Sequence, residues 1–321
     1  MSKRQRYVLR RAGAAAVIAF VAITFSFVLF RALPGDAVSN IAQSPRMTLE
    51  IKEVLRRNFG LDQPLTTQYV LYLGQLAHGN MGRSFQDSRP VTEVVLRAAA
   101  NTIPMAALGT LIGMVVGTLI GVTAAYRQGS SLDRAITGTS MVLYALPVQW
   151  LGLLMIALFA GVLPTSGMSD PYLIDPSFMA TFQDRLEHML LPSTCMALLL
   201  FGSFALVVRS SQLEALADDH VLTARAKGYR NRRVVWREAF RSAMLPLVSL
   251  STLTLGFLIA GGILTETVFG WPGVGRLTVQ AVSARDYPLL QGIFLVITLS
   301  VVFFNFLGDI LHAVLDPRVT Q

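Results

Sequence analysis

The sequence predicts an all-α membrane protein with six transmembrane helices. Of its 321 residues 53% are hydrophobic and only 14% are charged, a balance far more apolar than that of a soluble domain. Six stretches carry no charged residue and are long enough, at about 1.5 Å per helical residue, to cross a hydrocarbon layer of about 30 Å. The expected spans are Ala12 to Phe30, Thr102 to Tyr126, Ala135 to Gly161, Met189 to Val208, Ser242 to Thr265 and Pro288 to Gly308.

The N-terminal region combines a basic segment, residues 1–11, with a first transmembrane helix at residues 12–31. A signal peptide has a similar layout. The apolar core here is too long for one, and no small-residue cleavage site follows it, so a retained span is expected. The basic residues are Lys3, Arg4, Arg6, Arg10 and Arg11.

A long outer loop, residues 32–98, is expected to contain two short amphipathic helices. Thr48 to Gly60 has apolar residues on one face, and a second such pattern begins at Pro64 and ends near Gly79. Both are expected on the outer surface of the bundle or at the level of the lipid headgroups. Packing against the bundle and contact with an outside partner both remain open as roles.

The basic residues near the spans predict the orientation. They are concentrated at residues 1–11, at Arg127 and Arg134, and in the loop at residues 210–245, whereas the short loops on the other side hold few. Both termini are therefore expected in the cytoplasm, including a tail at residues 313–321. Residues 99–312 then form a core of five transmembrane helices that contains the 210–245 loop.

In the second expected span, glycines recur every fourth residue along one stripe: Gly109, Gly113, Gly117 and Gly121. Small residues at this spacing let membrane helices approach closely. Packing within the chain, sliding of a helix and contact with another subunit are the alternatives.

The loop from Asp219 to Pro246 is strongly basic and amphipathic. Asp219 is a suitable N-cap for a short helix, Lys227 places a cation in its last turn, and Gly228 can take the left-handed conformation that ends it. Asn231 can then cap a second helix, whose apolar residues are Val234, Val235, Ala239, Phe240 and Ala243. The alternatives are a basic loop held at the anionic inner leaflet and a docking surface for another protein.

Several kinds of chemistry have no motif in the sequence. The lone Cys195 and four widely separated histidines offer neither a metal site nor a catalytic centre, and no H-E-x-x-H or G-x-S-x-G motif occurs. The basic residues flank apolar runs instead of forming an aromatic-interleaved patch, which argues against nucleic-acid binding. No phosphate-binding G-x-x-x-x-G-K-[ST] loop is present, so active transport would need energy from another polypeptide.

Short motifs along nearly the whole chain resemble one family in the same order. They include TARAKG (Thr223 to Gly228), LPVQWLGLL (Leu146 to Leu154), ETVFGWPGVGR (Glu266 to Arg276) and RDYPLLQG (Arg285 to Gly292). Together they resemble the permeases of binding-protein-dependent ABC transporters, and within them the first-permease type of the dipeptide, oligopeptide and nickel branch. The superfamily's Glu-Ala-Ala triplet is absent in register, since Leu222, Thr223 and Ala224 stand there, and the outer segment Ser166 to Glu187 is longer and more acidic than expected.

This resemblance implies a type I ABC importer permease fold with a cytoplasmic coupling helix, in the inner membrane. It implies an importer of dipeptides or oligopeptides in which this chain and a second permease form the pathway. An extracytoplasmic binding protein would deliver the substrate. Two ATPase subunits would bind ATP and Mg²⁺, and this chain would hold no cofactor itself.

The resemblance and the local chemistry assign three groups of residues. Those expected to couple to the ATPase are Asp219, Thr223, Ala224, Arg225, Lys227, Gly228, Tyr229, Arg230, Leu245 and Pro246. Those expected to shape an outer mouth or gate are Glu266, Trp271, Pro272 and Gly273. Those considered as polar pathway lining are Gln149, Trp150, Ser203, Ser251, Thr252 and Thr254.

Other functions remain compatible with the sequence. The same machinery could import oligosaccharides, nickel complexes or other small solutes. In a different class, a standalone secondary transporter would show inverted repeats and interrupted midplane helices, and a membrane scaffold would transport nothing.

Overall fold

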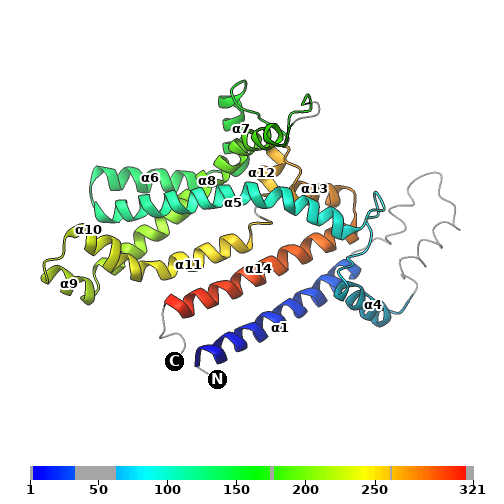
Figure 1. Ribbon diagram of the computed structural model, residues 1–321, viewed down its shortest axis with the longest axis horizontal. Helices are drawn as coiled ribbons and strands as arrows, with labels where there is room; N and C mark the ends of the chain where they lie inside the picture. The colour runs from blue at the N-terminus through cyan, green and yellow to red at the C-terminus, as the bar shows by residue number, and fades with distance from the viewer. Residues whose placement is uncertain (1–2, 33–62, 174–176, 261, 316–321) are drawn as a thin grey trace.

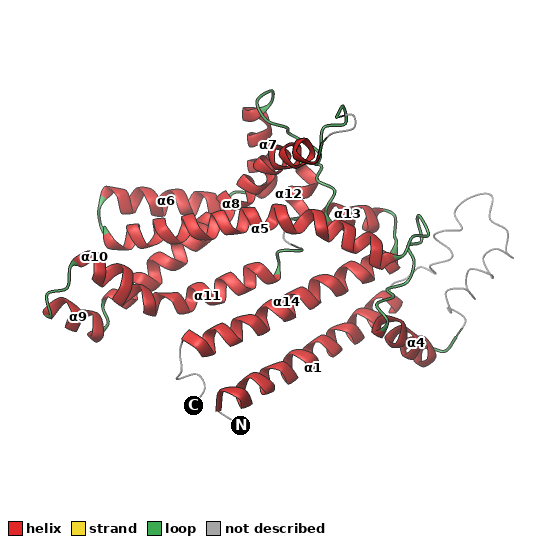
Figure 2. Cartoon of the chain, in the orientation of Figure 1, coloured by secondary structure: helices red, strands yellow, loops and turns green. Residues whose placement is uncertain are grey.

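Helices make up the regular structure of the computed structural model, which describes residues 3–32, 63–173, 177–260 and 262–315 (Figures 1 and 2). In these ranges four helices are long and apolar enough to cross a membrane: α1 (Lys3–Ala32), α5 (Val91–Tyr126), α8 (Phe178–Leu216) and α14 (Tyr287–Leu315). Because α5 has 36 residues, it is about 54 Å long and extends beyond the hydrocarbon layer into the expected loop at residues 32–98. The all-helical fold is therefore confirmed, with helices longer than the expected spans.

The third expected span, Ala135 to Gly161, is not one straight helix. It consists of α6 (Ser131–Ala145) and α7 (Val148–Phe159), which meet at an angle of 104°. Leu146 between them is extended, with φ −69° and ψ 130°, because the residue before a proline avoids the helical region. Counting the bent pair as one span raises the number of spans from four to five.

The fifth expected span, Ser242 to Thr265, also crosses a break. Helix α11 (Phe240–Gly256) ends well before Thr265, and α12 (Ile263–Val268) begins as a separate short helix after Gly262. At 17 residues α11 is shorter than the four long helices, so a count of six spans remains a prediction. Pro246, within the expected span, lies inside α11.

The glycine stripe of α5 packs against α8. A Cβ atom on Gly109, Gly113, Gly117 or Gly121 would lie 2.7–2.8 Å from an atom of α8, closer than real Cβ contacts allow. The facing atoms recur along α8 from Ser193 to Ala205, so the two helices stay in close contact over about 3.6 turns. Of the alternatives, the structure therefore shows packing within the chain.

The second expected amphipathic helix is confirmed as α4 (Leu65–Ala77), which begins after Pro64. It lies on α1, where Tyr69 and Tyr72 contact Phe27 at ring distances of 5.2 and 5.4 Å. The first expected helix, Thr48 to Gly60, lies outside the described residues.

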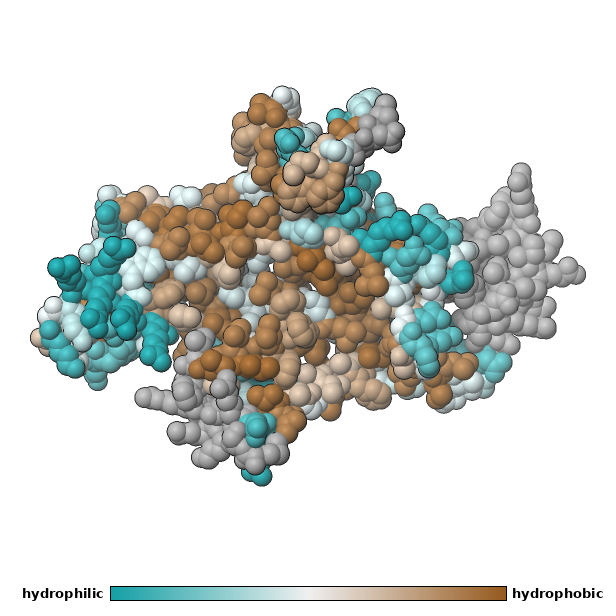
Figure 3. Space-filling view, in the orientation of Figure 1, coloured by the Kyte–Doolittle hydropathy of each residue, from teal (hydrophilic) through white to brown (hydrophobic). Residues whose placement is uncertain are grey.

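Two polar ends flank an apolar belt on the visible face (Figure 3). At one end are α9 (Asp219–Ala226) and α10 (Asn231–Arg233), and at the opposite end are α13 (Val274–Ser283) and α4 (Figure 1). We refer to these as the α9 end and the α13 end.

Candidate functional site

At the α9 end, the short helix α9 forms as the loop chemistry predicts, with one shift. The N-cap is Asp218, and Asp219 is the first helical residue, where its charge is still favourable near the helix N-terminus. The structure places Gly228 just past the helix with φ +76°, the left-handed conformation expected there. Asn231 likewise begins α10, with Arg230 as its N-cap.

One face of α9 is buried against the rest of the chain and the other is exposed. Val221 and Ala224 are 0% and 5% exposed, and Val221 joins a cluster with residues of α8 and α11. Ala224, expected at a partner surface, therefore packs inward. The exposed residues of the loop include Asp219, Leu222, Thr223, Arg225, Lys227, Gly228, Arg230, Arg232, Arg237 and Arg241.

The remaining residues of the coupling group are Tyr229, Leu245 and Pro246, and of these three Pro246 alone is exposed. Tyr229 is half-buried, and the guanidinium of Arg233 lies 4.0 Å from its ring centre. Leu245 and Pro246 lie within α11, one turn beyond the buried Ala243. Cationic side chains therefore surround α9 on an exposed surface, whereas its apolar side is fixed to the bundle.

A largely buried ion pair, which no motif in the sequence predicts, also holds the α9 end together. Arg209 on α8 donates from Nε and Nη2 to the Asp133 carboxylate on α6, at 2.6 and 2.9 Å. Asp133 is 3% exposed and also accepts from the Gly129 amide at 2.9 Å. The sequence does contain one indication of this pair, because Asp133 and Arg209 adjoin the ends of two expected spans on the same side.

At the α13 end, Glu266 organises the turn between α12 and α13. Its carboxylate is 0% exposed and accepts from the Thr102 hydroxyl at 2.6 Å and from the Arg276 amide at 3.1 Å. The Trp271 indole donates to the Asn101 carbonyl at 3.0 Å, and the Asn101 amide donates to the Pro272 carbonyl at 2.9 Å. This network fixes the turn to α5.

Gly273 in that turn has no room for a side chain, because a Cβ there would overlap Glu266 and Thr102. The expected outer-mouth residues therefore lie together, as a packed turn anchored on a neighbouring helix.

In the acidic segment Ser166 to Glu187, the residues from Phe178 onward belong to α8, and Asp170 lies against them. The Asp170 amide lies 3.2 Å from both carboxylate oxygens of Asp184, and the His188 ring lies 3.2 Å from the same carboxylate. Within the described ranges, no group of three His, Cys, Asp or Glu side chains could hold a metal ion.

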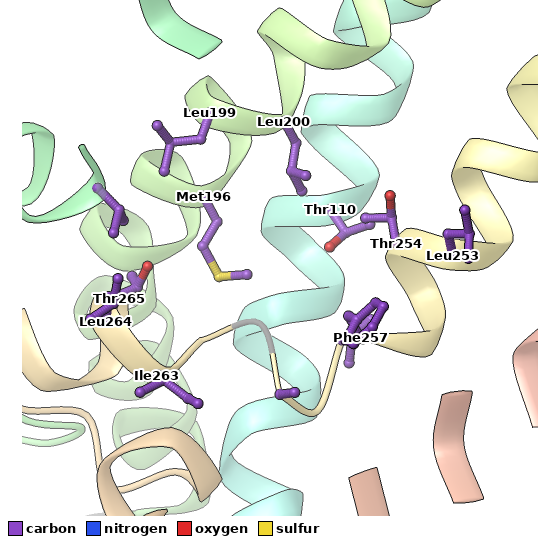
Figure 4. Close-up of a pocket in the computed structure, with 13 residues that line it drawn as sticks. Thr110, Met196, Leu199, Leu200, Leu253, Thr254, Phe257, Ile263, Leu264 and Thr265 are labelled. Atoms are coloured by element: carbon purple, nitrogen blue, oxygen red, sulfur yellow. The ribbon is translucent and has the colours of Figure 1, made fainter. Parts of the chain in front are cut away.

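A cavity of about 610 Å³ opens between α5, α8, α11 and α12 (Figure 4). Leucine and methionine side chains from α8 and α11 line it, together with Phe257 just after α11 and the threonines Thr110, Thr254 and Thr265. The Thr254 hydroxyl donates to the Leu250 carbonyl of its own helix at 2.8 Å. No charged residue is among the described lining residues, so the cavity suits apolar groups.

Of the residues considered as pathway lining, Thr254 alone borders this cavity. Gln149 and Trp150 are exposed on α7, with Trp150 72% exposed. Ser203 and Ser251 donate to carbonyls of their own helices, and Thr252 packs against Gly308.

Comparison with protein families covers nearly the whole chain. Residues 117–321 match the family described as "Binding-protein-dependent transport system inner membrane component". Residues 4–106 match the N-terminal family of the same transport systems.

Curated relatives are similar over their full length. The "Di/tripeptide transport system permease protein DppB" of Pseudomonas aeruginosa is 36% identical over 330 residues, covering 98% of both chains. The "Dipeptide transport system permease protein DppB" of Escherichia coli is 34% identical with the same coverage, and the "Oligopeptide transport system permease protein AppB" of Bacillus subtilis is 31% identical, also covering 98% of both.

Among solved structures, the one described as "Inward facing conformations of the MetNI methionine ABC transporter" aligns with a TM-score of 0.56. It covers 71% of this chain and 99% of that one, at 17% identity, and so supports the fold. Given both family matches and the full-length relatives, the chain belongs to the inner membrane components of binding-protein-dependent transport systems, the permease subunits of ABC importers.

Proposed function

We propose that this chain is a permease subunit of an ATP-driven importer of dipeptides or oligopeptides. The observation that carries the proposal is 36% identity, over 98% of both chains, to a di/tripeptide permease. Two further relatives with peptide substrates in their names match over the same share of the chain. With a second permease the chain would form the pathway, and an extracytoplasmic binding protein would deliver the peptide.

The α9 end is the proposed cytoplasmic side, where two ATPase subunits would bind ATP and Mg²⁺. The positive-inside rule supports this orientation, because a cluster of exposed cations that includes Arg225, Lys227 and Arg230 surrounds α9. The same rule supports a cytoplasmic location for both termini. Arg225, Lys227 and Arg230 are free to face acidic groups of an ATPase, and the exposed Gly228 lets its backbone approach closely.

Transport in this scheme depends on differential binding. An ATPase can shift the permease between inward-facing and outward-facing states only if its contacts with α9 differ between those states. The cavity beside Thr254 is the proposed place where the pathway receives an apolar side chain of the peptide, since it holds no charge that would retain the passenger. Selectivity would then rest mainly with the binding protein.

Isolation of the whole assembly tests this proposal. The chain is affinity-tagged and purified with its partners, and the complex is reconstituted in vesicles with its binding protein. We expect a nucleotide-binding chain and a second permease to co-purify, and uptake of labelled dipeptides to require ATP. Uptake without ATP, or purification without a nucleotide-binding chain, would contradict the proposal. Mass spectrometry of the ligand on the binding protein separates peptides from oligosaccharides and nickel complexes.

A further inference from the structure

A turn of π-helix interrupts the helix that links α9 to α11. This turn, η1 (Val234–Ala239), follows α10 and continues directly into α11. At its end the Phe240 amide donates to the Val235 carbonyl, five residues earlier. Turns of this kind are rare and occur frequently at functional sites.

Two adjacent valines of η1 are buried in different clusters. Val234 packs in the cluster that contains Val221 of α9, whereas Val235 packs with Val122 of α5 and Val208 of α8. Both valines are almost fully buried, at 0% and 3% exposed. The π-helical turn therefore joins the helix with the exposed cations to the tightly packed α5–α8 pair.

Side chains from α8 and α9 bond to carbonyls of the same turn. The Gln212 amide, from the last turns of α8, donates to the Val235 carbonyl at 2.9 Å. From α9, the His220 ring nitrogen lies 3.3 Å from the Glu238 carbonyl. Both neighbouring helices thus contact η1 by polar bonds as well as by apolar packing.

Packing alone does not explain why the polar Gln212 side chain is buried. It is 0% exposed, and its Oε1 has no hydrogen-bond partner among the described residues. The Val235 carbonyl already accepts from Phe240, so it does not need Gln212 for its own satisfaction. An apolar residue of equal length would avoid the cost of the unpaired oxygen.

We propose that Gln212 is a positioning residue that fixes η1 to α8, so that a displacement of α9 is carried into α8 and α11 together. The proposal rests on the proposed function, in which α9 receives movement from an ATPase. Without the Gln212 bond, α9 and η1 would still pack but could shift against α8, and part of each ATPase movement would be lost.

The number of peptides taken up per ATP hydrolysed tests this role in the complete reconstituted complex. Gln212→Met removes the donor at nearly constant length, and Gln212→Asn keeps an amide that is one methylene shorter. In both we expect ATP hydrolysis to continue and the ratio to fall by about 2-fold to 30-fold, the range for mutations between coupled sites. Ser211→Ala, which removes a hydroxyl at the adjacent position of α8, is the control and should leave the ratio unchanged.

Three results would overturn the proposal. One is an unchanged ratio in an assembled variant, even where uptake and ATP hydrolysis fall together. Another is failure of both variants to assemble, because this would assign Gln212 to stability instead of transmission. The third is an equal fall in the ratio for Ser211→Ala. ATP-independent uptake by the unaltered complex would instead refute the proposed function, so the two failures are distinguishable.

Discussion

The α5–α8 pair and the α11–α12 segment are packed in opposite ways. Along α5, four glycines bring the backbone against α8 so closely that a Cβ on Gly117 would lie 2.7 Å from the Phe204 Cβ. Helix α11 instead ends at Gly256, and the following segment borders a cavity of about 610 Å³. Closely packed interfaces resist continuous deformation, whereas broken, loosely packed elements have room for a second arrangement. We refer to the closely packed α5–α8 pair as the frame. The α11–α12 segment beside it, which borders the cavity, has room to move.

Breaking the frame should have the largest effect. Gly117→Leu would force a side chain into the α8 interface, where overpacking costs about 1–3 kcal/mol or more. We expect little folded protein in the membrane, measured by the monodisperse fraction in size-exclusion chromatography of detergent extracts. Gly138→Leu on α6, where a Cβ would meet nothing within 4 Å, is the matched control and should retain folded protein. Equal yields of the two variants would contradict the rigid-frame interpretation.

A substitution at Gly228, just past the end of α9, should reduce transport strongly and leave the α5–α8 pair intact. Gly228→Asp places an acid among exposed cations and a side chain at φ +76°, where a non-glycine residue costs about 1–2 kcal/mol. Because the added acid would weaken contacts between these cations and acidic groups of an ATPase, we expect ATP-driven uptake to fall by about tenfold, which corresponds to about 1.4 kcal/mol, or the ATPase to be lost from the complex. Gly161→Asp, at φ +82° beyond α7, imposes similar strain away from α9 and should keep more than half of the uptake. Normal uptake by Gly228→Asp would refute the role of α9.

Loosening the frame at the α9 end should have an intermediate effect. Asp133→Asn leaves Arg209 without its bidentate partner, and losing one partner of a buried pair costs about 3–5 kcal/mol. The cost here should be smaller, because the Arg209 side chain is 25% exposed. We expect a lower unfolding temperature in detergent with transport reduced in proportion. Asp87→Asn, at an exposed ion pair with Arg89, should change the unfolding temperature little. Equal shifts in unfolding temperature for the two variants would show that the Asp133–Arg209 pair stabilises the protein no more than an exposed ion pair does.

Filling the cavity beside Thr254 should have the smallest effect on transport. Thr254→Phe adds an aromatic ring to the cavity, which should slow uptake of peptides with large apolar side chains by several-fold and leave dialanine uptake unchanged. Competition between the two labelled peptides in the reconstituted complex measures this difference. Thr252→Val, beside Gly308 and away from the described lining, is the control. Equal slowing of both peptides would refute a pathway role for the cavity.

The sequence predicts the close packing in this contrast, but it does not predict the breaks in the third and fifth expected spans. The glycine spacing predicted close packing, and the apolar pattern from Val234 to Ala243 predicted the buried face behind α9. Pro147 and the Gly261-Gly262 pair lie within two apolar stretches, and the apolar content of each stretch predicts one continuous span. Gln212 and Val235 lie 23 positions apart on different helices, so no local pattern predicts their bond.

The central claim, that α9 is the contact for an ATPase, is tested most directly by site-specific cross-linking. A cysteine replaces Arg225 on α9 or, as control, the exposed Gln75 on α4 at the α13 end; the natural Cys195 is 0% exposed and does not compete. In the purified complex we expect Arg225→Cys to form a product with the nucleotide-binding chain, in an amount that changes when ATP is added, and Gln75→Cys to form none. Absence of that product for Arg225→Cys, or an equal product for both cysteines, would contradict the claim.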